Sequence, residues 1–265
     1  MKGVAPARDS RGFTILEMLI AMAIFLAICA AMFGLLQLSQ QKYASESELS
    51  ASFQEARLAM DQIVRDINVA GYPSLGLYSV LPTDPSSYAV GPVAWYPNYY
   101  PLAGGCAIET GGGTGCATPG DFDLIVETRL GNDTSVSWVR YYLNGTTLYR
   151  AVAQKTSDSD PRTPLMAAGV AVPFLVNVMN NAPGQLPGGV PVPIFQYTCN
   201  TPAGPTGNPP QPLPCPAAGV LYDLPQNVRD VDVTLIVATP QADRQTHAVK
   251  LVELNGSGHT WNGSH

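Results

Sequence analysis

Residues 11–36 read RGFTILEMLIAMAIFLAICAAMFGLL, and this stretch decides the fold of the chain. After Phe13 its only polar side chains are those of Thr14 and Glu17. At about 1.5 Å per residue, a helix over residues 13–36 is roughly 36 Å long, which is enough to cross a bilayer. The sequence therefore predicts a membrane-spanning helix at residues 13–36, with one carboxylate near its start.

The carboxylate of Glu17 needs an explanation, because an acidic side chain at the centre of a bilayer costs about 2.5 to 3.5 kcal/mol. One explanation is that Glu17 lies at the level of the lipid headgroups, where the cost is lower. The preceding segment, MKGVAPARDSRG, suggests another, because it is short and basic. A secretory signal has its cleavage site after the apolar segment, whereas the Gly12-Phe13 junction precedes it here.

A basic leader, Gly12 and then FTILEMLIA resembles the prepilin motif of type IV pilins and type II secretion pseudopilins. The resemblance implies that a membrane aspartyl peptidase removes residues 1–12 and methylates the new amine of Phe13. It also implies that Glu17 pairs with the N-terminal amine of a neighbouring subunit inside the fibre. A buried carboxylate is tolerable only with such a positive partner, so Glu17 is expected to set the register of assembly.

The predicted helix continues through residues 37–71 as an amphipathic helix. Its apolar residues recur at steps of four and three, which places them on one side of a helix. They are Leu49, Phe53, Ala56, Met60, Ile63, Ile67 and Ala70, with the charged residues placed elsewhere. Gly71 followed by Tyr72-Pro73 is a helix stop signal. We expect this stripe to pack under a sheet; an isolated coiled-coil dimer is the alternative.

Small residues recur every four positions within the membrane half of the helix. They are Ala23, Ala27 and Ala31 in one series, and Ala30 and Gly34 in another. Such spacing lets helices approach closely, so Ala23, Ala27, Ala31 and Gly34 are predicted packing positions. The abundance of alanine in membrane helices is the alternative explanation.

The remainder, residues 72–265, is predicted to be one β-rich globular domain outside the cytoplasm. Strand patterns occur at residues 122–130, 135–143, 146–152, 228–239 and 247–254. The Asn144-Gly145 pair between the second and third strands is a strong hairpin signal. Two Pro/Gly-rich regions, about 71–120 and 180–219, interrupt the strands. The expected fold class is α+β: a long N-terminal helix on an antiparallel sheet with long loops, which is the pilin fold.

Later segments sharpen the resemblance. The helix end follows an R-D-I-x-x-A-G-Y pattern at residues 65–72, and the hairpin reads VRYYLNGTTLYR at residues 139–150. Together with NVRDVDVTLIVAT at 227–239, they are similar to PilW-type minor pilins and to J-type pseudopilins. The resemblance implies a minor pilin that helps to prime assembly of a type IV pilus. A J-type pseudopilin of type II secretion and a tip-located adhesin subunit are the alternatives.

The resemblance also implies partners and a location. The partners are other minor and major pilins, which it contacts through the N-terminal helix, the prepilin peptidase, and a tip adhesin. The protein is expected in the bacterial inner membrane, with its C-terminal domain in the periplasm, and then in the pilus at the cell surface. Direct nucleic-acid binding is not expected, because the formal net charge is -6.

The chain has five cysteines. Cys29 falls in the membrane helix, where a free thiol behaves as a small apolar residue. The other four, in Gly/Pro-rich loops, are disulfide candidates for an oxidising compartment. We favour Cys106 with Cys116 and Cys199 with Cys215, because each pair closes a local loop, although other pairings remain open. A zinc site is the competitor, but no CxxC occurs and the histidines gather near the C-terminus.

No signature of catalysis is present: the sequence lacks GxSxG, HExxH, P-loop and dinucleotide-binding motifs. We therefore expect neither an enzyme nor a cofactor. TSDSDP at residues 156–161 offers several oxygens to calcium but lacks the length of an EF-hand loop. Asp121 and Asp123 are two apart at the start of a predicted strand, where solvated carboxylates are ordinary. The tyrosines and Trp95 of the first loop region either form a recognition surface or pack that loop onto the sheet.

Overall fold

The computed structural model describes residues 14–94, 119–156, 169–182, 188–200, 212–215, 228–243 and 248–260, with the single positions 161, 165, 167, 184 and 186. The chain divides into two compact units, residues 1–48 and 49–265. They are described separately below.

A single helix, α1, runs from Ile15 to Asn68. It confirms the prediction of one long N-terminal helix, although it ends three residues before the expected boundary. Gly71 adopts a φ of 85°, a left-handed conformation that glycine enters without steric cost. Its N–H donates to the carbonyl of Glu127 at 2.7 Å. The chain therefore leaves the helix by pairing with the first strand.

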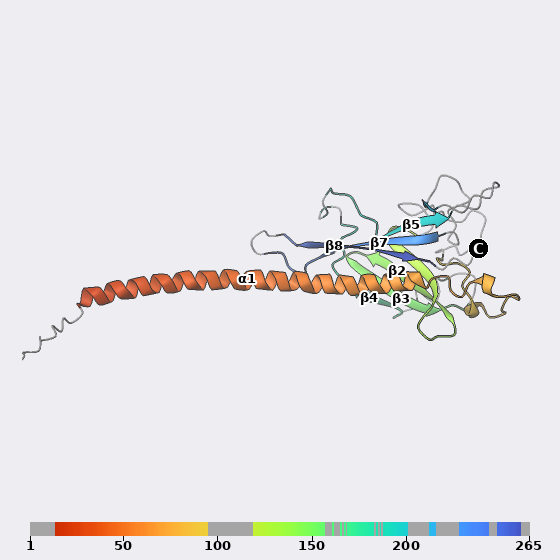
Figure 1. Ribbon diagram of the computed structural model, residues 1–265, viewed down its shortest axis with the longest axis horizontal. Helices are drawn as coiled ribbons and strands as arrows, with labels where there is room; N and C mark the ends of the chain where they lie inside the picture. The colour runs from red at the N-terminus through yellow and green to blue at the C-terminus, as the bar shows by residue number, and fades with distance from the viewer. Residues whose placement is uncertain are drawn as a thin grey trace, which may run out of the picture. The chain divides into compact units, whose positions relative to one another are not determined.

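The strands form two antiparallel sheets (Figure 1), where the sequence predicted one. The first sheet has the order β1-β2-β3-β4, with β1 at Asp123–Arg129, β2 at Val136–Asn144, β3 at Thr147–Gln154 and β4 at Ala171–Leu175. The second has the order β6-β5-β7-β8, with β5 at Phe195–Asn200, β6 at Pro212–Pro214, β7 at Val228–Ala238 and β8 at Leu251–His259. Short 3₁₀ helices lie at Leu75–Leu77 (η1) and Pro85–Ser87 (η2). A helix with antiparallel sheets is the expected α+β architecture of the pilin fold.

The hairpin between β2 and β3 confirms the Asn-Gly signal with a shift of one residue. Asn144 pairs with Thr147, so the turn consists of Gly145 and Thr146. Gly145 has a φ of 60° and takes the first turn position, where tight hairpins need a residue that tolerates positive φ.

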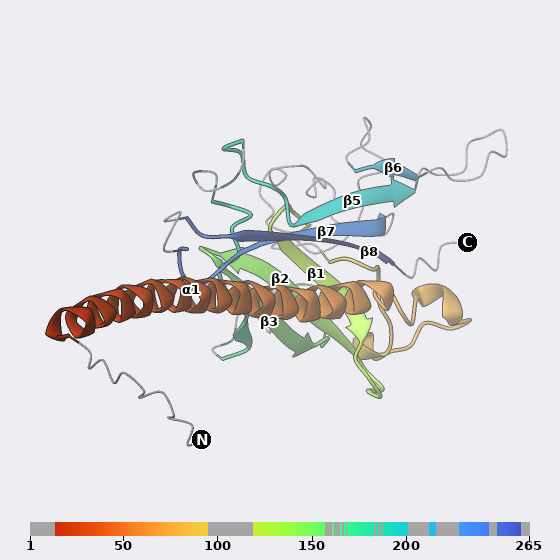
Figure 2. The same ribbon diagram turned by 60° about the vertical axis from the view of Figure 1, so that its left-hand side comes forward.

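Residues 49–68 of α1 share one core with both sheets. Ala56, Met60 and Ile63 of the helix are buried with residues of β1 to β3 and of β5 and β7. Figure 2 shows this part of the helix alongside β8 and across β2 and β3. The predicted stripe is thus buried from Ala56 onward, whereas Phe53 remains 41% exposed.

Two glycines of β8 let the helix approach closely. A Cβ added to Gly256 would lie 2.7 Å from Sδ of Met60, and one added to Gly258 would lie 2.5 Å from Cγ2 of Ile67. Any larger side chain at these positions would push the helix away from the strand. This Asn-Gly-Ser-Gly run has the composition of a turn, but it is a strand here because it pairs along β7.

Candidate functional site

Glu17 lies in the first turn of α1 and is bonded reciprocally to Thr14. The backbone N–H of Thr14 donates to Oε2 of Glu17 at 2.9 Å, and the Thr14 hydroxyl donates to the same oxygen at 3.1 Å. In return, the N–H of Glu17 donates to Oγ1 of Thr14 at 3.3 Å. This is a capping box, which satisfies N–H groups that have no partner inside the helix. The carboxylate is therefore held at the very start of the apolar segment.

The apolar side chains that follow have no cover within the chain. Every large apolar side chain from Ile15 to Leu36 is between 50% and 83% exposed. In the described part of the chain, α1 is the one helix long and apolar enough to cross a membrane. A continuous apolar surface of this size is unstable in water and indicates contact with lipid or with other helices.

The predicted packing positions Ala23, Ala27, Ala31 and Gly34 all lie on this exposed part of the helix. A Cβ added to Gly34 would meet nothing within 4 Å, so the surface at that point is open. Their role in contact between subunits remains a prediction. Gly12 and Phe13, the predicted processing residues, lie outside the described residues.

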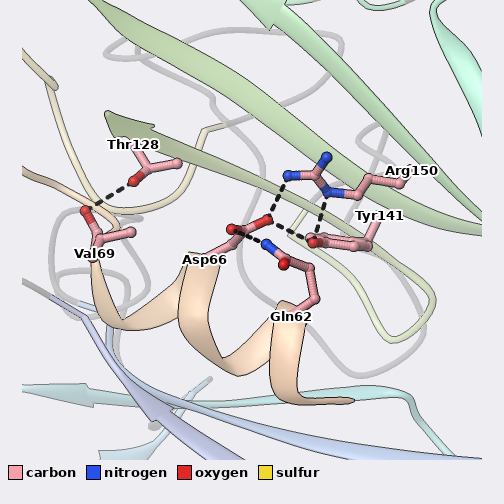
Figure 3. Close-up of polar contacts among 6 residues, drawn as sticks. All are labelled: Gln62, Asp66, Val69, Thr128, Tyr141 and Arg150. Carbon is pink, nitrogen blue, oxygen red and sulfur yellow. Dashed lines mark hydrogen bonds and ion pairs between the residues drawn. The ribbon is translucent and has the colours of Figure 1, made fainter. Parts of the chain in front are cut away.

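A buried polar cluster centred on Asp66 joins α1 to the first sheet (Figure 3). Asp66 is only 2% exposed. Its Oδ2 accepts hydrogen bonds from the hydroxyl of Tyr141 at 2.6 Å and from Nη2 of Arg150 at 2.8 Å. Its Oδ1 accepts from Nε2 of Gln62 at 2.8 Å. Nε of Arg150 also donates to the Tyr141 hydroxyl at 2.9 Å, so we call these four residues the Asp66 cluster.

The Asp66 cluster behaves as a structural clamp. Burial and the neighbouring Asp66 carboxylate raise the pKa of Tyr141 above its usual value, so the hydroxyl stays protonated and donates. Beside the cluster, the Thr128 hydroxyl donates to the carbonyl of Val69 at 3.1 Å (Figure 3).

The burial of Asp66 corrects one sequence prediction. We expected the charged residues of the helix to lie away from its packed face, and this was wrong for Asp66. The sequence did contain a signal for this burial. Residue 66 is three positions after Ile63 and four before Ala70, and residues at these spacings lie on the same face of a helix.

A second buried cluster fixes the described part of the first loop region to the sheet. Glu127 and Lys155 are fully buried, with Nζ and Oε2 3.4 Å apart. Glu127 accepts from the N–H of Val90 at 2.7 Å and from Nε1 of Trp138 at 3.0 Å. Lys155 donates to the carbonyl of Tyr88 at 2.9 Å. The Tyr88 side chain is buried, with Nζ of Lys155 4.7 Å from its ring centroid, so it serves packing, the second of the two roles considered for the loop aromatics. Trp95 lies outside the described residues.

The family comparison bears on the N-terminal segment. Residues 7–33 match the model of the prokaryotic N-terminal methylation motif. This motif marks the type IV pilin superfamily. Among curated proteins no match to the chain was found, and among solved structures none was found either. The superfamily is structural rather than enzymatic, and its members associate with other pilus or pseudopilus components. The apolar helix and the motif together fit membrane anchoring and a place in a pilus.

The globular unit contains the predicted disulfide between Cys199 and Cys215. Their Cα atoms are 5.5 Å apart, and β5 and β6 pair beside the bond. Cys29 is a free thiol, as expected. Cys106 and Cys116 lie outside the described residues, so their pairing remains a prediction.

Asp123 is not the solvated carboxylate that the sequence suggested. It forms a two-point ion pair with Arg140, with Nε to Oδ1 at 3.0 Å and Nη2 to Oδ2 at 2.6 Å. Burial nevertheless raises the pKa of Asp123 to about 6, against the lowering effect of Arg140. The pair lies inside the sheet, since Asp123 is on β1 and Arg140 on β2. It is therefore a structural ion pair of the globular unit.

Among the described residues, no group of three or more His, Cys, Asp or Glu side chains lies close enough to hold a metal ion. The calcium candidate at residues 156–161 falls largely outside the described residues.

Proposed function

We propose that the protein is a minor pilin of a type IV pilus that promotes pilus assembly as part of a priming and tip complex. In this proposal, residues 1–12 are removed by prepilin peptidase, and residues 13–36 hold the subunit in the inner membrane. Residues 37–71 continue the helix into a periplasmic domain formed by residues 72–265. The observation that carries the proposal is the uncovered apolar surface from Ile15 to Leu36, with Glu17 at its start.

In this proposal, the exposed apolar helix is buried first in the lipid of the membrane and then among the helices of the fibre. At about 25 cal/mol per Å² of apolar surface, burial in lipid stabilises the stored subunit, and burial among other helices stabilises the fibre. A transfer between the two leaves the apolar term almost unchanged, because lipid tails are as apolar as leucine. The polar contact made by Glu17 can then decide whether a subunit enters the fibre in register.

The capping box leaves Glu17 able to make that contact. Both bonds from Thr14 to the carboxylate reach Oε2. Within the described residues, Oε1 has no hydrogen-bond partner, and it is available to the N-terminal amine of a neighbouring subunit. An unpaired carboxylate in an apolar bundle is costly, so a subunit out of register would be rejected.

Support for a minor rather than a major subunit comes from the domain. The helix-end segment 65–72 and the hairpin segment 139–150, which carry the resemblance to PilW-type minor pilins, meet in the Asp66 cluster. Bulky loops would crowd neighbours in a regular helical lattice, whereas a tip position has no subunit above it. This is the reason for preferring a place at or near the tip.

The proposal is tested by deleting the gene and counting fibres by electron microscopy, with complementation by wild type and by Glu17→Ala. Fibres should become rare, and the wild-type chain should restore them whereas Glu17→Ala should not. Glu46→Ala, on the same helix beyond the apolar segment, is the matched control and should restore fibres. Normal fibre numbers would contradict the minor-pilin assignment. If a secreted enzyme were then retained in the periplasm of the deletion strain, the assignment as a J-type pseudopilin would replace the assignment as a minor pilin.

A further inference from the structure

An open groove of about 620 Å³ lies within the globular unit, between the helix and the edge of the first sheet. One wall is α1 over residues 55–65, and the other is formed by residues 173–176, from β4 and the position after it. Neither the Asp66 cluster nor the exposed apolar segment of residues 15–36 accounts for this groove.

The walls of the groove carry apolar side chains that the domain leaves in solvent. Leu58 is 70% exposed and Val176 is 47% exposed, although nearby helix residues such as Ile63 are fully buried. The groove has a fixed base, because Gln62 is bonded to Asp66 and the ring of Phe174 packs against Tyr141 with centroids 5.4 Å apart. It is therefore a preformed apolar surface that costs little to order on binding.

The shape of the groove favours a helix over a strand as its occupant. The helical wall extends about 15 Å, the rise of ten residues, and so accommodates two to three turns of a second helix. The opposite wall is a poor site for strand addition, because β4 has five residues and Pro173 supplies no N–H. Ridges of an incoming helix can enter between Leu58 and Val176.

The charges on the rim indicate what that helix carries. Glu55, Asp61 and Arg65 line the groove, and within the described part of the chain none of them has an ion-pair partner closer than 4 Å. Asp61 and Arg65 stand at the i, i+4 spacing that often gives a pair, yet they do not pair here. The rim thus presents two uncompensated carboxylates and one cation to a partner.

We propose that this groove docks an amphipathic helix of a different pilin-superfamily subunit, whose basic side chains face Glu55 and Asp61. The inference rests on the proposed function, because it names the partner surface of the assembled complex. A second copy of this chain packed in parallel, as subunits stand in a fibre, is a poorer occupant, since it would bring Glu55 and Asp61 against their own counterparts. The docked helix fills the space between Leu58 and Val176.

The test places a photocrosslinking amino acid, p-benzoylphenylalanine, at Leu58 or Val176 of the full-length chain in its native cells. Val190 is 65% exposed but does not line the groove, so it serves as the control position. Illumination should yield a crosslink from both groove positions but not from position 190. Mass spectrometry should map the crosslinked peptide to a helix of another pilin-superfamily subunit.

A charge reversal sharpens the test. Glu55→Lys combined with Asp61→Lys should lower the crosslink yield about ten-fold or more, the scale on which central interface residues act. Asp232→Lys reverses an exposed carboxylate on β7 and should leave the yield unchanged. A crosslink to this chain's own sequence, to lipid, or to none would overturn the inference, as would equal yields in the two charge variants.

The same strains separate this inference from the proposed function. If Glu17→Ala abolishes fibres while the groove positions give no crosslink, the assembly role stands and the docking site is wrong. If fibres are normal in the deletion strain, the minor-pilin proposal is wrong. A crosslink to a pseudopilin in the cells that express the Leu58 or Val176 crosslinking variant would then keep the docking site within a secretion complex.

Discussion

The Asp66 cluster makes a quantitative prediction about how the helix is attached to the sheet. Asp66→Ala removes the acceptor of Tyr141, Arg150 and Gln62. Breaking one partner of a buried ion pair costs about 3 to 5 kcal/mol. The side chain of Arg150 is 21% exposed and can form hydrogen bonds with water after the substitution. The lower end of this energy range therefore applies. We expect the free energy of unfolding to fall by about 3 kcal/mol.

Tyr141→Phe provides a graded comparison for this prediction. It keeps the ring that packs against Phe174 and removes only the hydroxyl, so a loss of about 1 kcal/mol is expected. Asp61→Ala, five residues before Asp66 on the same helix and not bonded to it, should stay within about 0.5 kcal/mol of wild type.

The assay is urea unfolding of the full-length chain in detergent micelles, followed by tryptophan fluorescence, because Trp138 is fully buried in the domain. Free energies follow from linear extrapolation to zero urea. If Asp66→Ala lost less than about 1 kcal/mol relative to Asp61→Ala, the cluster would contribute little. The view of it as the clamp between helix and sheet would then be wrong.

Three further predictions use the same assay. Gly258→Ala should lower stability by about 1 to 3 kcal/mol, because the added Cβ would lie 2.5 Å from an α1 side chain. Cys199→Ser with Cys215→Ser should lower it by about 3 kcal/mol, the scale for a bond that closes a loop of this separation, 16 residues. Burial raises the pKa of Asp123 to about 6, so its contribution to stability is fully present below about pH 4 and is lost as the pH rises through 6. Asp123→Asn should remove this dependence between pH 4 and 6.

Each of these predictions has a control within the chain. Gly184→Ala adds a Cβ that meets nothing within 4 Å, and it should be nearly neutral; an equal loss at both glycines would contradict the close-packing argument. Cys29→Ser removes a thiol that is free and should leave urea unfolding of the domain unchanged. Asp232→Asn, on an exposed carboxylate, should keep the wild-type pH profile. A wild-type domain that gained stability between pH 4 and 6 would show the sign at Asp123 to be wrong.

The sequence predicted the parts of the fold that depend on local pattern. The apolar run of residues 13–36, the stripe through Ile63 and Ile67, and the Gly145 hairpin each follow from spacing within a few residues. The pairing of Cys199 with Cys215 followed from the short loop between them. Glu17 was recognised from its place in the motif, although its bonds to Thr14 required the structure.

What the sequence missed depends on contacts between distant segments. No strand was predicted at β4, which contains Pro173, and β5 and β6 lie in a region that was predicted as a Pro/Gly-rich loop. They become strands because a neighbouring strand supplies the hydrogen bonds, and this pairing is not encoded locally. Gly256 and Gly258 are residues typical of a turn, and only the structure shows that they lie in a strand against the helix. The roles of Asp66 and of the Glu127 cluster likewise require partners that are far away along the chain.

Mass spectrometry of sheared surface fibres is the most direct test of whether this chain is a processed fibre subunit. We expect the fibre fraction to contain this chain, in minor amount, beginning with N-methylated Phe13. A Gly12→Leu variant should retain residues 1–12 and be absent from fibres. If the chain instead remained in the inner membrane with Met1 to Gly12 intact, and no copy reached the fibre fraction, the account would be contradicted.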